Sequence, residues 1–372
     1  MSGANPPERL ARLRARQAPM VDTLGALVEI ESPSSDADGL AKCAAAVSAL
    51  FEDSLGRPPA SEGAHLHWSG GGPPLVVVIG HFDTVWPLGT LARRPFTVAD
   101  GVASGPGALD MKAGIVQLLE ALRTLEDIAG VDVVLTADEE VGSHTSRALV
   151  ERVAIGTRGA LVLEPSVPGG ALKTGRKGTG DYTLQVRGRA AHAGNEPERG
   201  ANALVALAEV VLATTRLARP ELGTTVTPTL ATAGSASNVV PAEATAALDV
   251  RATTLEEAAR LDADLRALAT AVPGTSLVVE GGFNRPPMPT SASAELFALA
   301  QACAARLGLA PLTGTAVGGG SDGNFTAAIG VPTLDGLGGV GAGMHAEDEH
   351  VIVTAMAERA ALLAELIDDL RR

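Results

Sequence analysis

Side chains that could bind metal ions follow successive apolar runs of this sequence. His81 and Asp83 end a run that starts at Leu75, two adjacent glutamates end a run that starts at Val131, and a further glutamate ends the run ALVLE. The whole set is His81, Asp83, Asp110, Glu139, Glu140, Glu164 and His345. If these groups converge, the carboxylates repel one another and cannot all stay ionised without cations. Imidazole and carboxylate ligands without thiolates suit zinc and related divalent metals, and a shared set suits two ions.

The apolar runs are expected to be strands of one sheet. Residues 75–79, 131–140 and 159–165 are rich in Val, Ile and Leu, which is typical of strands buried on both faces. Residues 111–127 carry apolar side chains at helical spacing. This succession of strand, helix, strand and strand predicts an α/β layer structure with a largely parallel sheet. Ligands bind at the carboxyl ends of the strands in such sheets, and the charged residues lie at those ends.

The middle of the chain has a different pattern. Between residues 175 and 285 the sequence predicts a strand, a helix at 202–217, two strands, a helix at 255–270 and a last strand. This order is the ferredoxin-like split pattern, in about the length of one small domain. From residue 286 the chain returns to buried helices, and the last of them is expected at 354–370. The prediction is a larger domain, 1–174 with 286–372, into which residues 175–285 insert a small α+β domain.

The composition fits two folded domains and excludes several classes of protein. The 372 residues are 46% apolar and 19% charged, which is enough for buried cores and unlike a disordered chain. A net charge of −14 and 2% aromatic residues argue against nucleic acid or an anionic membrane as partner. No apolar run approaches the length of a membrane span, and the N-terminal segment lacks the apolar core of a secretory signal. We therefore expect a cytoplasmic protein.

Several further residues have simpler interpretations. Cys43 and Cys303 lie in Ala-rich segments and are expected to be small buried side chains rather than metal ligands or a disulfide. The run GGGSD at 318–322 lacks the Gly-Lys-Thr/Ser ending of a phosphate-binding loop, so we expect a tight turn that lines the pocket. Three histidines are expected in exposed loops, namely His65, His67 and His144.

An ordered series of segments carries a resemblance to a known family over nearly the whole chain. The segments are GHFDTVWPLGTLARRPF, ASGPGALDMKAG, TADEEVGS, LEPS, GRKGTGDYTLQVRGRAAHAG, GSASNVVPA, DVR, GGGSDGNF and GMHAEDEHV. In this order they resemble the zinc aminoacylase family, which includes acetylornithine deacetylase, succinyl-diaminopimelate desuccinylase and, most similar here, glutamate carboxypeptidase. The resemblance implies a zinc-exopeptidase-like mixed sheet flanked by helices, with the ferredoxin-like insertion serving as lid and dimerisation domain.

The resemblance also implies two zinc ions in each chain, with cobalt or manganese able to substitute. By matching position, Asp110 bridges the two ions, and the peptide bond after it is cis in relatives. His81 and Glu164 complete the protein ligands of the first ion. Glu140 and His345 hold the second ion.

Residues next to these ligands also match family positions. Asp83 matches the carboxylate that orients the first imidazole, and Glu139 matches the general base that acts on the water between the metals. On spacing alone His350 rivals His345 as a ligand. The frame Met-His-x-x-x-Glu favours His345 and makes Glu349 a supporting residue.

Four residues of the inserted segment match family positions that contact the substrate. His192 matches a donor that reaches the neighbouring subunit's site and polarises the scissile carbonyl. Asn238, Arg251 and Arg285 match substrate-binding positions, and a guanidinium suits a substrate carboxylate. The implied partners are a small acyl-amino acid or peptide substrate and a second copy of the chain, joined through the inserted domain.

The sequence predicts a metal-dependent hydrolase that cleaves the amide between an acyl or peptidyl group and a C-terminal amino acid of the glutamate type. The alternative among enzymes is an N-acyl-amino-acid deacylase of the acetylornithine deacetylase type, or a dipeptidase, that uses the same site. A metal-binding dimer without turnover is an alternative of another class. The presence of Glu139 argues against that alternative, because a protein without turnover has little reason to keep a general base that is not a metal ligand.

Overall fold

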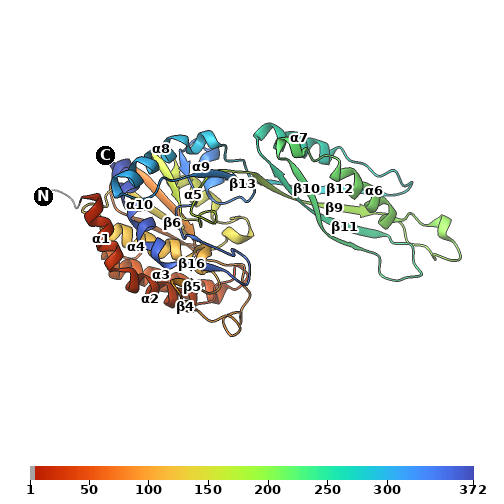
Figure 1. Cartoon of the computed structure of the whole chain (residues 1–372). Coiled ribbons are helices and arrows are strands. Elements are labelled where there is room, and N and C mark those ends of the chain that lie inside the picture. The colour runs from red at the N-terminus through yellow and green to blue at the C-terminus, as the bar shows by residue number, and fades with distance from the viewer. Residues whose placement is uncertain (1–4) are drawn as a thin grey trace. The chain divides into compact units, whose positions relative to one another are not determined.

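The computed structural model describes residues 5–372, which form two compact units (Figure 1). Unit 1 contains the chain up to Gly175 together with Pro289–Val317 and Ser321–Arg372. Unit 2 contains Arg176–Met288 and the short segment Gly318–Gly320. Each unit has its own sheet and its own hydrophobic core. No helix in the described part of the chain is long and apolar enough to cross a membrane.

A six-stranded mixed sheet forms the centre of unit 1. Its order is β1-β2-β6-β3-β7-β14, in which the last four strands are parallel and the first two join the edge antiparallel. The strands are β1 (Ala60–Glu62), β2 (His65–Ser69), β3 (Val76–His81), β6 (Val131–Thr136), β7 (Gly159–Val162) and β14 (Thr333–Leu334). β3, β6 and β7 are buried along their whole length, as strands covered on both faces must be.

Helices cover both faces of this sheet. Side chains alternate along a strand, so Val76 and Val78 of β3 pack into the core formed with α2, α3, α4 and α10. Val77 and Ile79 pack into a second core formed with α5 and α9. The helices of unit 1 are α1 (Pro6–Ala15), α2 (Gln17–Val28), α3 (Ala37–Leu55), α4 (Ala113–Arg123), α5 (Arg147–Ala154), α8 (Thr290–Leu307), α9 (Gly323–Ala328) and α10 (Val353–Arg371).

Short strands complete unit 1. One small sheet has the order β15-β16-β5-β4, and β13 pairs with β8. These strands are β4 (Thr97–Ala99), β5 (Val102–Ser104), β8 (Leu172–Arg176), β13 (Gly314–Val317), β15 (Gly341–Ala342) and β16 (His350–Ile352). Cys43 in α3 and Cys303 in α8 are buried and form no disulfide, as predicted.

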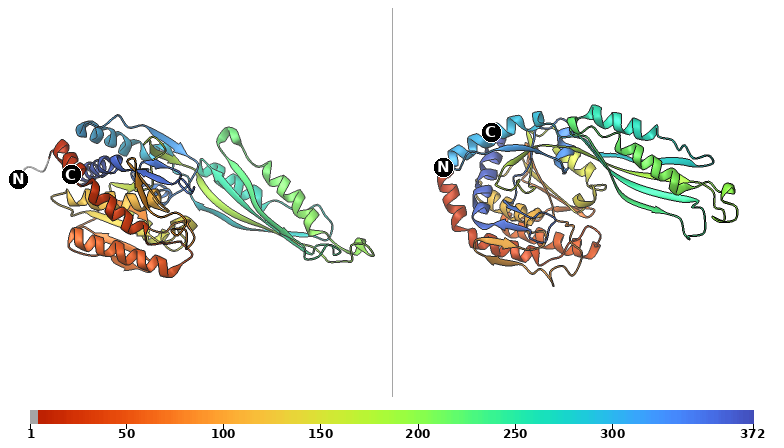
Figure 2. Two further views of the ribbon diagram at one scale, coloured as in Figure 1. Left: turned by 60° about the horizontal axis from the view of Figure 1, so that its bottom comes forward. Right: turned by 45° about the vertical axis from the view of Figure 1, so that its right-hand side comes forward.

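Unit 2 is a four-stranded antiparallel sheet with two helices (Figure 2). The strand order β10-β11-β9-β12, combined with the chain order strand-helix-strand-strand-helix-strand, is the predicted ferredoxin-like arrangement. Alternate residues of β9, such as Tyr182 and Leu184, pack against α6 and α7. The elements are β9 (Gly178–Arg187), α6 (Ala203–Thr215), β10 (Thr225–Ala233), β11 (Glu243–Ala252), α7 (Leu255–Arg266) and β12 (Ser276–Arg285).

Two elements beside the charged residues are shorter than predicted. The strand expected at 131–140 ends at Thr136, and Glu139–Val141 form a single 3-10 turn. The helix expected at 111–127 spans Ala113–Arg123 and follows an irregular helical turn at Ala108–Lys112. Within that turn the Asp110–Met111 peptide bond is cis, as the family resemblance implied. Asp110, Glu139 and Glu140 therefore lie on turns just outside the regular elements.

The expectation of an exposed loop is wrong for His65 and His67. Both lie in β2, which pairs antiparallel with β6. His65 is 4% exposed, its Nδ1 accepts the N–H of Ala137 at 3.2 Å, and its Nε2 lies 3.0 Å from Thr145 Oγ1. His67 Nε2 lies 2.7 Å from Asp132 Oδ1. The segment HLHWS is polar, and its partner strand β6 is distant in the sequence. The sequence alone therefore did not identify this segment as a strand.

Candidate metal centre

Three parallel strands bring the candidate ligands to one edge of the sheet. His81 is the last residue of β3. Glu140 lies four residues beyond the end of β6, and Glu164 lies two residues beyond the end of β7. Because β6, β3 and β7 are neighbours and parallel, their carboxyl ends lie together. The sequence-based expectation of convergence at this edge rests on the same topology.

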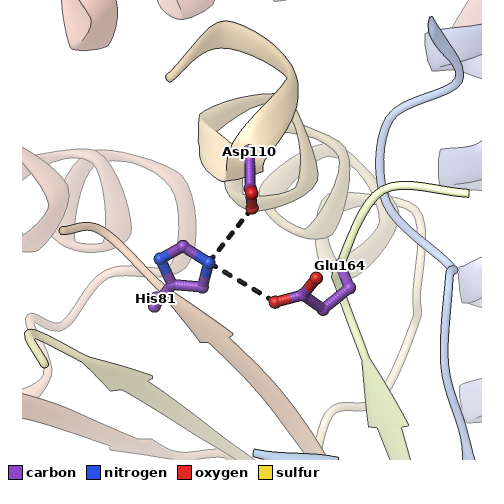
Figure 3. A group of neighbouring side chains, drawn as sticks. All are labelled: His81, Asp110 and Glu164. Carbon is purple, nitrogen blue, oxygen red and sulfur yellow. Dashed lines mark hydrogen bonds and ion pairs between the residues drawn. The ribbon is translucent and has the colours of Figure 1, made fainter. Parts of the chain in front are cut away.

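The first group of possible ligands is His81, Asp110 and Glu164 (Figure 3). His81 Nε2 lies 3.2 Å from Asp110 Oδ1 and 3.5 Å from Glu164 Oε1. All three side chains are buried. Lys173 Nζ lies 3.4 Å from the other carboxylate oxygen of Glu164, a contact for which the sequence carried no signal. One imidazole nitrogen therefore faces two carboxylates, and a cation could bind among these three groups.

The second group is Asp110, Glu140 and His345. His345 Nε2 lies 3.0 Å from Asp110 Oδ2 and 3.3 Å from Glu140 Oε2. Its side chain is 46% exposed, whereas the side chains of Asp110 and Glu140 are 6% and 7% exposed. The two oxygens of Asp110 thus face different imidazoles, Oδ1 facing His81 and Oδ2 facing His345. Asp110 is shared by the two groups, as a carboxylate that bridges two metal ions would be.

The charges of the site also fit divalent cations. Burial disfavours a charged His81, but hydrogen bonds with Asp110, Asp83 and Glu164 raise its pKa well above the ordinary value. Hydrogen bonds to Asp110 and Glu140 raise the pKa of His345 to about 10. The carboxylates thus favour positive charge at both rings. Imidazole and carboxylate together are suitable donors for zinc and similar divalent ions, which would supply that positive charge.

Asp83 holds the first imidazole and the Glu139–Glu140 turn at once. It is completely buried. His81 Nδ1 lies 3.0 Å from the backbone oxygen of Asp83 and 3.4 Å from its Oδ1. The same carboxylate accepts the backbone N–H groups of Glu139 and Glu140, both at 3.2 Å, and the hydroxyl of Ser34 at 2.7 Å. Asp83 is therefore placed to orient a metal-binding imidazole, and Ser34 is a contributor that the sequence analysis missed.

Glu349 organises the turn that carries Asp110. Its carboxylate accepts the backbone N–H groups of Gly107 at 3.0 Å, Leu109 at 2.9 Å and Asp110 at 3.1 Å. The indole Nε1–H of Trp86 donates to it at 2.8 Å. Glu349 is completely buried and does the supporting work that its sequence frame indicated, while nothing in the sequence pointed to Trp86.

Asp322 braces the other side of the Glu139–Glu140 turn. It accepts hydrogen bonds from Thr136 Oγ1 at 3.0 Å and from Ser143 Oγ. Thr136 ends β6 just before the turn, and Ser143 follows it. The sequence analysis treated Asp322 only as part of a glycine-rich turn, because the contact joins residues nearly two hundred positions apart.

In unit 2 the predicted residues His192 and Asn238 lie side by side. The segments form a bridge between His192 and Val239, and the N–H of Ala193 donates to the backbone oxygen of Asn238 at 2.9 Å. His192 is exposed, and its Nδ1 accepts the N–H groups of Gly194 at 3.1 Å and the following residue at 3.0 Å. The ring proton is therefore on Nε2, which makes that nitrogen the donor.

The two predicted arginines lie in a different part of the same sheet. Arg251 on β11 and Arg285 on β12 are both register partners of Thr179 on β9, one on each side. The guanidinium of Arg251 holds Asp249 through two hydrogen bonds of 2.8 and 2.6 Å. Arg285 is 8% exposed. His192 follows the opposite end of β9, so these arginines and His192 lie at opposite ends of the unit 2 sheet.

Comparisons with known proteins identify the family. The model of peptidase family M20/M25/M40 matches residues 77–369, and the chain belongs to this family. It is 31% identical to carboxypeptidase G2 of Pseudomonas sp. (strain RS-16), covering 95% of this chain and 90% of that protein. It is 32% identical to succinyl-diaminopimelate desuccinylase of Methylorubrum extorquens (strain PA1), covering 79% of this chain and 82% of that protein. The chain is accordingly a metallopeptidase-type hydrolase of amide bonds.

Solved structures share the fold. Aminopeptidase PepT from Bacillus cereus ATCC 10987 has a TM-score of 0.77 at 23% identity, with 96% of this chain and 99% of that chain covered. The YXEP protein of Bacillus subtilis, described as a dinuclear metal-binding peptidase of the M20 family, has a TM-score of 0.67 at 14% identity, with 96% and 99% covered. These similarities confirm the predicted mixed sheet flanked by helices.

Proposed function

We propose that this chain is a two-metal carboxypeptidase that hydrolyses the amide bond before a C-terminal amino acid of an N-acyl or peptidyl substrate. The observation that carries the proposal is the position of Asp110, whose two oxygens face His81 and His345 separately. Two groups of possible ligands that share one carboxylate would suit a pair of divalent ions. We assign zinc to both positions, with cobalt or manganese able to replace it.

The chain's own residues provide the proton transfers. Bound metals would supply Lewis-acid polarisation and a water of lowered pKa. Glu139 takes a proton from the attacking water and returns it to the nitrogen of the leaving amino acid, so that the C–N bond breaks without a charged amide leaving group. Asp83 supports this step by accepting a hydrogen bond from the backbone N–H of Glu139, which fixes the position of the backbone that carries the base. His192 Nε2–H donates to the oxyanion that forms at the scissile carbonyl.

Arg285 is our candidate to bind the free carboxylate of the substrate. It is buried at the end of β12, close in sequence to the return of the chain to unit 1 at Pro289. The guanidinium of Arg251 is already held by Asp249, so we rank Arg251 second to Arg285 as the substrate-binding group. A guanidinium in a dry site binds carboxylate in a bidentate manner and discriminates against a neutral amide.

A second copy of the chain is the proposed source of His192 and Asn238. Strands rise about 3.3 Å per residue, so Thr179 and Arg187 at the two ends of β9 are roughly 26 Å apart. One small substrate cannot contact Arg285, beside Thr179, and His192, beyond Arg187, within the same unit 2. We therefore propose a homodimer formed through unit 2, in which each chain lends His192 and Asn238 to its partner. We place this dimer in the cytoplasm.

Deacylation of an N-acyl amino acid is the second candidate function. The similarity to succinyl-diaminopimelate desuccinylase favours it, since that relative covers four fifths of the chain. The match to carboxypeptidase G2 covers a larger share of this chain and a larger share of the relative than the match to the desuccinylase does. We therefore rank a glutamate-type C-terminal product first. Both candidates use the same metal groups and differ in the acyl portion of the substrate.

Substrate carboxylate recognition provides the test. We compare kcat/KM for an N-acyl-glutamate and for the same compound with its α-carboxyl group converted to a primary amide. Leaving a buried arginine without its carboxylate costs at least tenfold, so the acid should react at least ~10-fold faster. Arg285→Ala should remove this preference, and Arg12→Ala on the exposed face of α1 should keep it. Equal rates for acid and amide on the unmodified protein would contradict carboxylate anchoring.

A further inference from the structure

A cavity of about 200 Å³ in unit 1 is lined by none of the metal-binding residues. It lies among α10, the residues that follow α8 and the turn at Gly169–Gly170. Its walls are mostly apolar, with Leu312, Val340 and Leu362 among them. One charged side chain in the wall, that of Arg359, is buried to 6% exposure.

Arg359 has fewer partners than its charge requires. Its Nη2 donates to the backbone oxygen of Gly170, whose φ of 91° and missing side chain permit the close approach. A Cβ on Gly170 would lie 3.1 Å from Nη2. Within residues 5–372, no atom accepts a hydrogen bond from Nη1 of Arg359. Burial lowers the pKa of Arg359 to about 10, so the guanidinium still carries its positive charge at neutral pH.

Comparison with another buried arginine shows what is missing. Arg9 is 4% exposed, and its guanidinium contacts Glu365 together with Asp368 at 2.8 Å. Arg359 has no such carboxylate among the described residues, although a buried charge without a counter-ion is strongly unfavourable. Glu358 also lines the cavity, and its negative charge favours the charged form of Arg359. Its carboxylate contacts the guanidinium of Arg14 at 2.9 Å, however, and it accepts no hydrogen bond from Nη1 of Arg359.

We propose that this cavity binds a small aliphatic carboxylate, with its charged group on Arg359 and its hydrocarbon portion against the apolar wall. The planar guanidinium has N–H groups spaced to match the two oxygens of a carboxylate. Leu309 and Leu312, which are only partly buried, would stay in contact with water if the occupant were chloride or phosphate, whereas a short alkyl chain covers them. The volume limits the occupant to a few carbon atoms beyond the carboxylate.

Thermal unfolding of the metal-loaded protein in sodium propionate tests the site. Chloride is exchanged for propionate at constant ionic strength, and a parallel series uses phosphate. Saturating propionate should raise the Tm by about 2 °C or more. Arg359→Met should lose this rise, and without propionate it should be no less stable than the unmodified protein, because the uncompensated charge has gone. Propionate bound at the metal groups would stabilise every variant equally and so cancels in the comparison.

Two further variants make the result independent of whether Arg359→Met folds. Ala355→Leu keeps the guanidinium but fills the cavity that Ala355 lines, and it should also lose the propionate response. Arg158→Met is the matched control, since Arg158 also donates to one backbone oxygen, that of Leu370 at 2.9 Å, but lies outside the cavity. It should respond like the unmodified protein. A full propionate response in Arg359→Met or Ala355→Leu, or an equal rise when phosphate replaces chloride, would overturn the proposal.

Discussion

The carboxylate of Asp83 accepts the backbone N–H of Glu139 at 3.2 Å. The same side chain lies 3.4 Å from Nδ1 of His81, so one buried carboxylate connects a proposed metal ligand with the proposed general base. If the ring of His81 and the start of the Glu139 turn are fixed by one group, the base cannot shift independently of the metal. The contacts of Asp83 thus connect the ends of two neighbouring strands, β3 and β6, through protein atoms alone.

Substituting Asp83 should therefore weaken both metal binding and turnover. In Asp83→Asn the side chain keeps its size but loses its charge and one of its acceptor oxygens. We expect metal affinity to fall about 10- to 100-fold, because groups that orient a metal-binding imidazole typically contribute that much. Ser34→Ala removes only one of the hydrogen bonds to Asp83, keeps its charge and should change affinity much less. Competition with a chelator measures both variants. Unchanged affinity in Asp83→Asn would remove Asp83 from the account.

Mixed dimers test whether His192 acts on the partner's site. His192→Ala and Glu139→Gln should each be nearly inactive alone. If His192 acts in trans, a mixed dimer has one site with both groups intact, so an equal mixture should recover about a quarter of normal activity. A mixture of Glu139→Gln and Glu140→Gln is the control. It should recover nothing, because each chain of the mixed dimer then carries a change in its own metal site and neither site is intact. No recovery after verified subunit exchange would place His192 outside the partner's site.

The pairing of His67 with Asp132 predicts a pH-dependent contribution to stability. The hydrogen bond to Asp132, assisted by Glu62, raises the pKa of His67 above its ordinary value near 6.5. A raised pKa means that the stabilisation is complete below pH 6.5 and is lost as the pH rises through the folded-state pKa. His67→Gln should therefore lower the free energy of unfolding by about 0.5 kcal/mol at pH 6 and by less at pH 9.

Urea unfolding at the two pH values measures this difference. His144→Gln is the control for a histidine-to-glutamine change elsewhere in the same unit, because His144 is an exposed histidine on a turn. If His67→Gln destabilised the protein more at pH 9 than at pH 6, the protonated pairing with Asp132 would be wrong.

The sequence was most informative where topology alone brings residues together. Val-rich runs predicted the buried strands, and parallel strands leave His81, Glu140 and Glu164 at one edge without any knowledge of loop conformation. Asp110 and His345 come from turns rather than strand ends and carry no periodicity of their own, so the family resemblance was needed to assign them to particular metal ions.

Contacts between distant polar residues could not be predicted in this way. Trp86 and Glu349 are more than two hundred positions apart, and only the folded chain brings the indole to that carboxylate. The pair formed by Arg251 and Asp249 illustrates a different limit. Alternation along β11 places the two side chains on one face, but whether an arginine binds a substrate or its neighbour depends on rotamers, which the sequence pattern does not encode.

Metal content and turnover measured on the same samples of Glu139→Gln and Glu140→Gln test the central claim most directly. The unmodified protein should hold two divalent ions per chain and lose activity when they are chelated. Glu139→Gln should keep both ions but turn over about 10²- to 10⁴-fold more slowly, because only the proton transfer is removed. Glu140→Gln should lose metal as well as activity, because Glu140 belongs to the second ligand group. Near-normal turnover by fully metal-loaded Glu139→Gln, or by metal-free unmodified protein, would contradict the account.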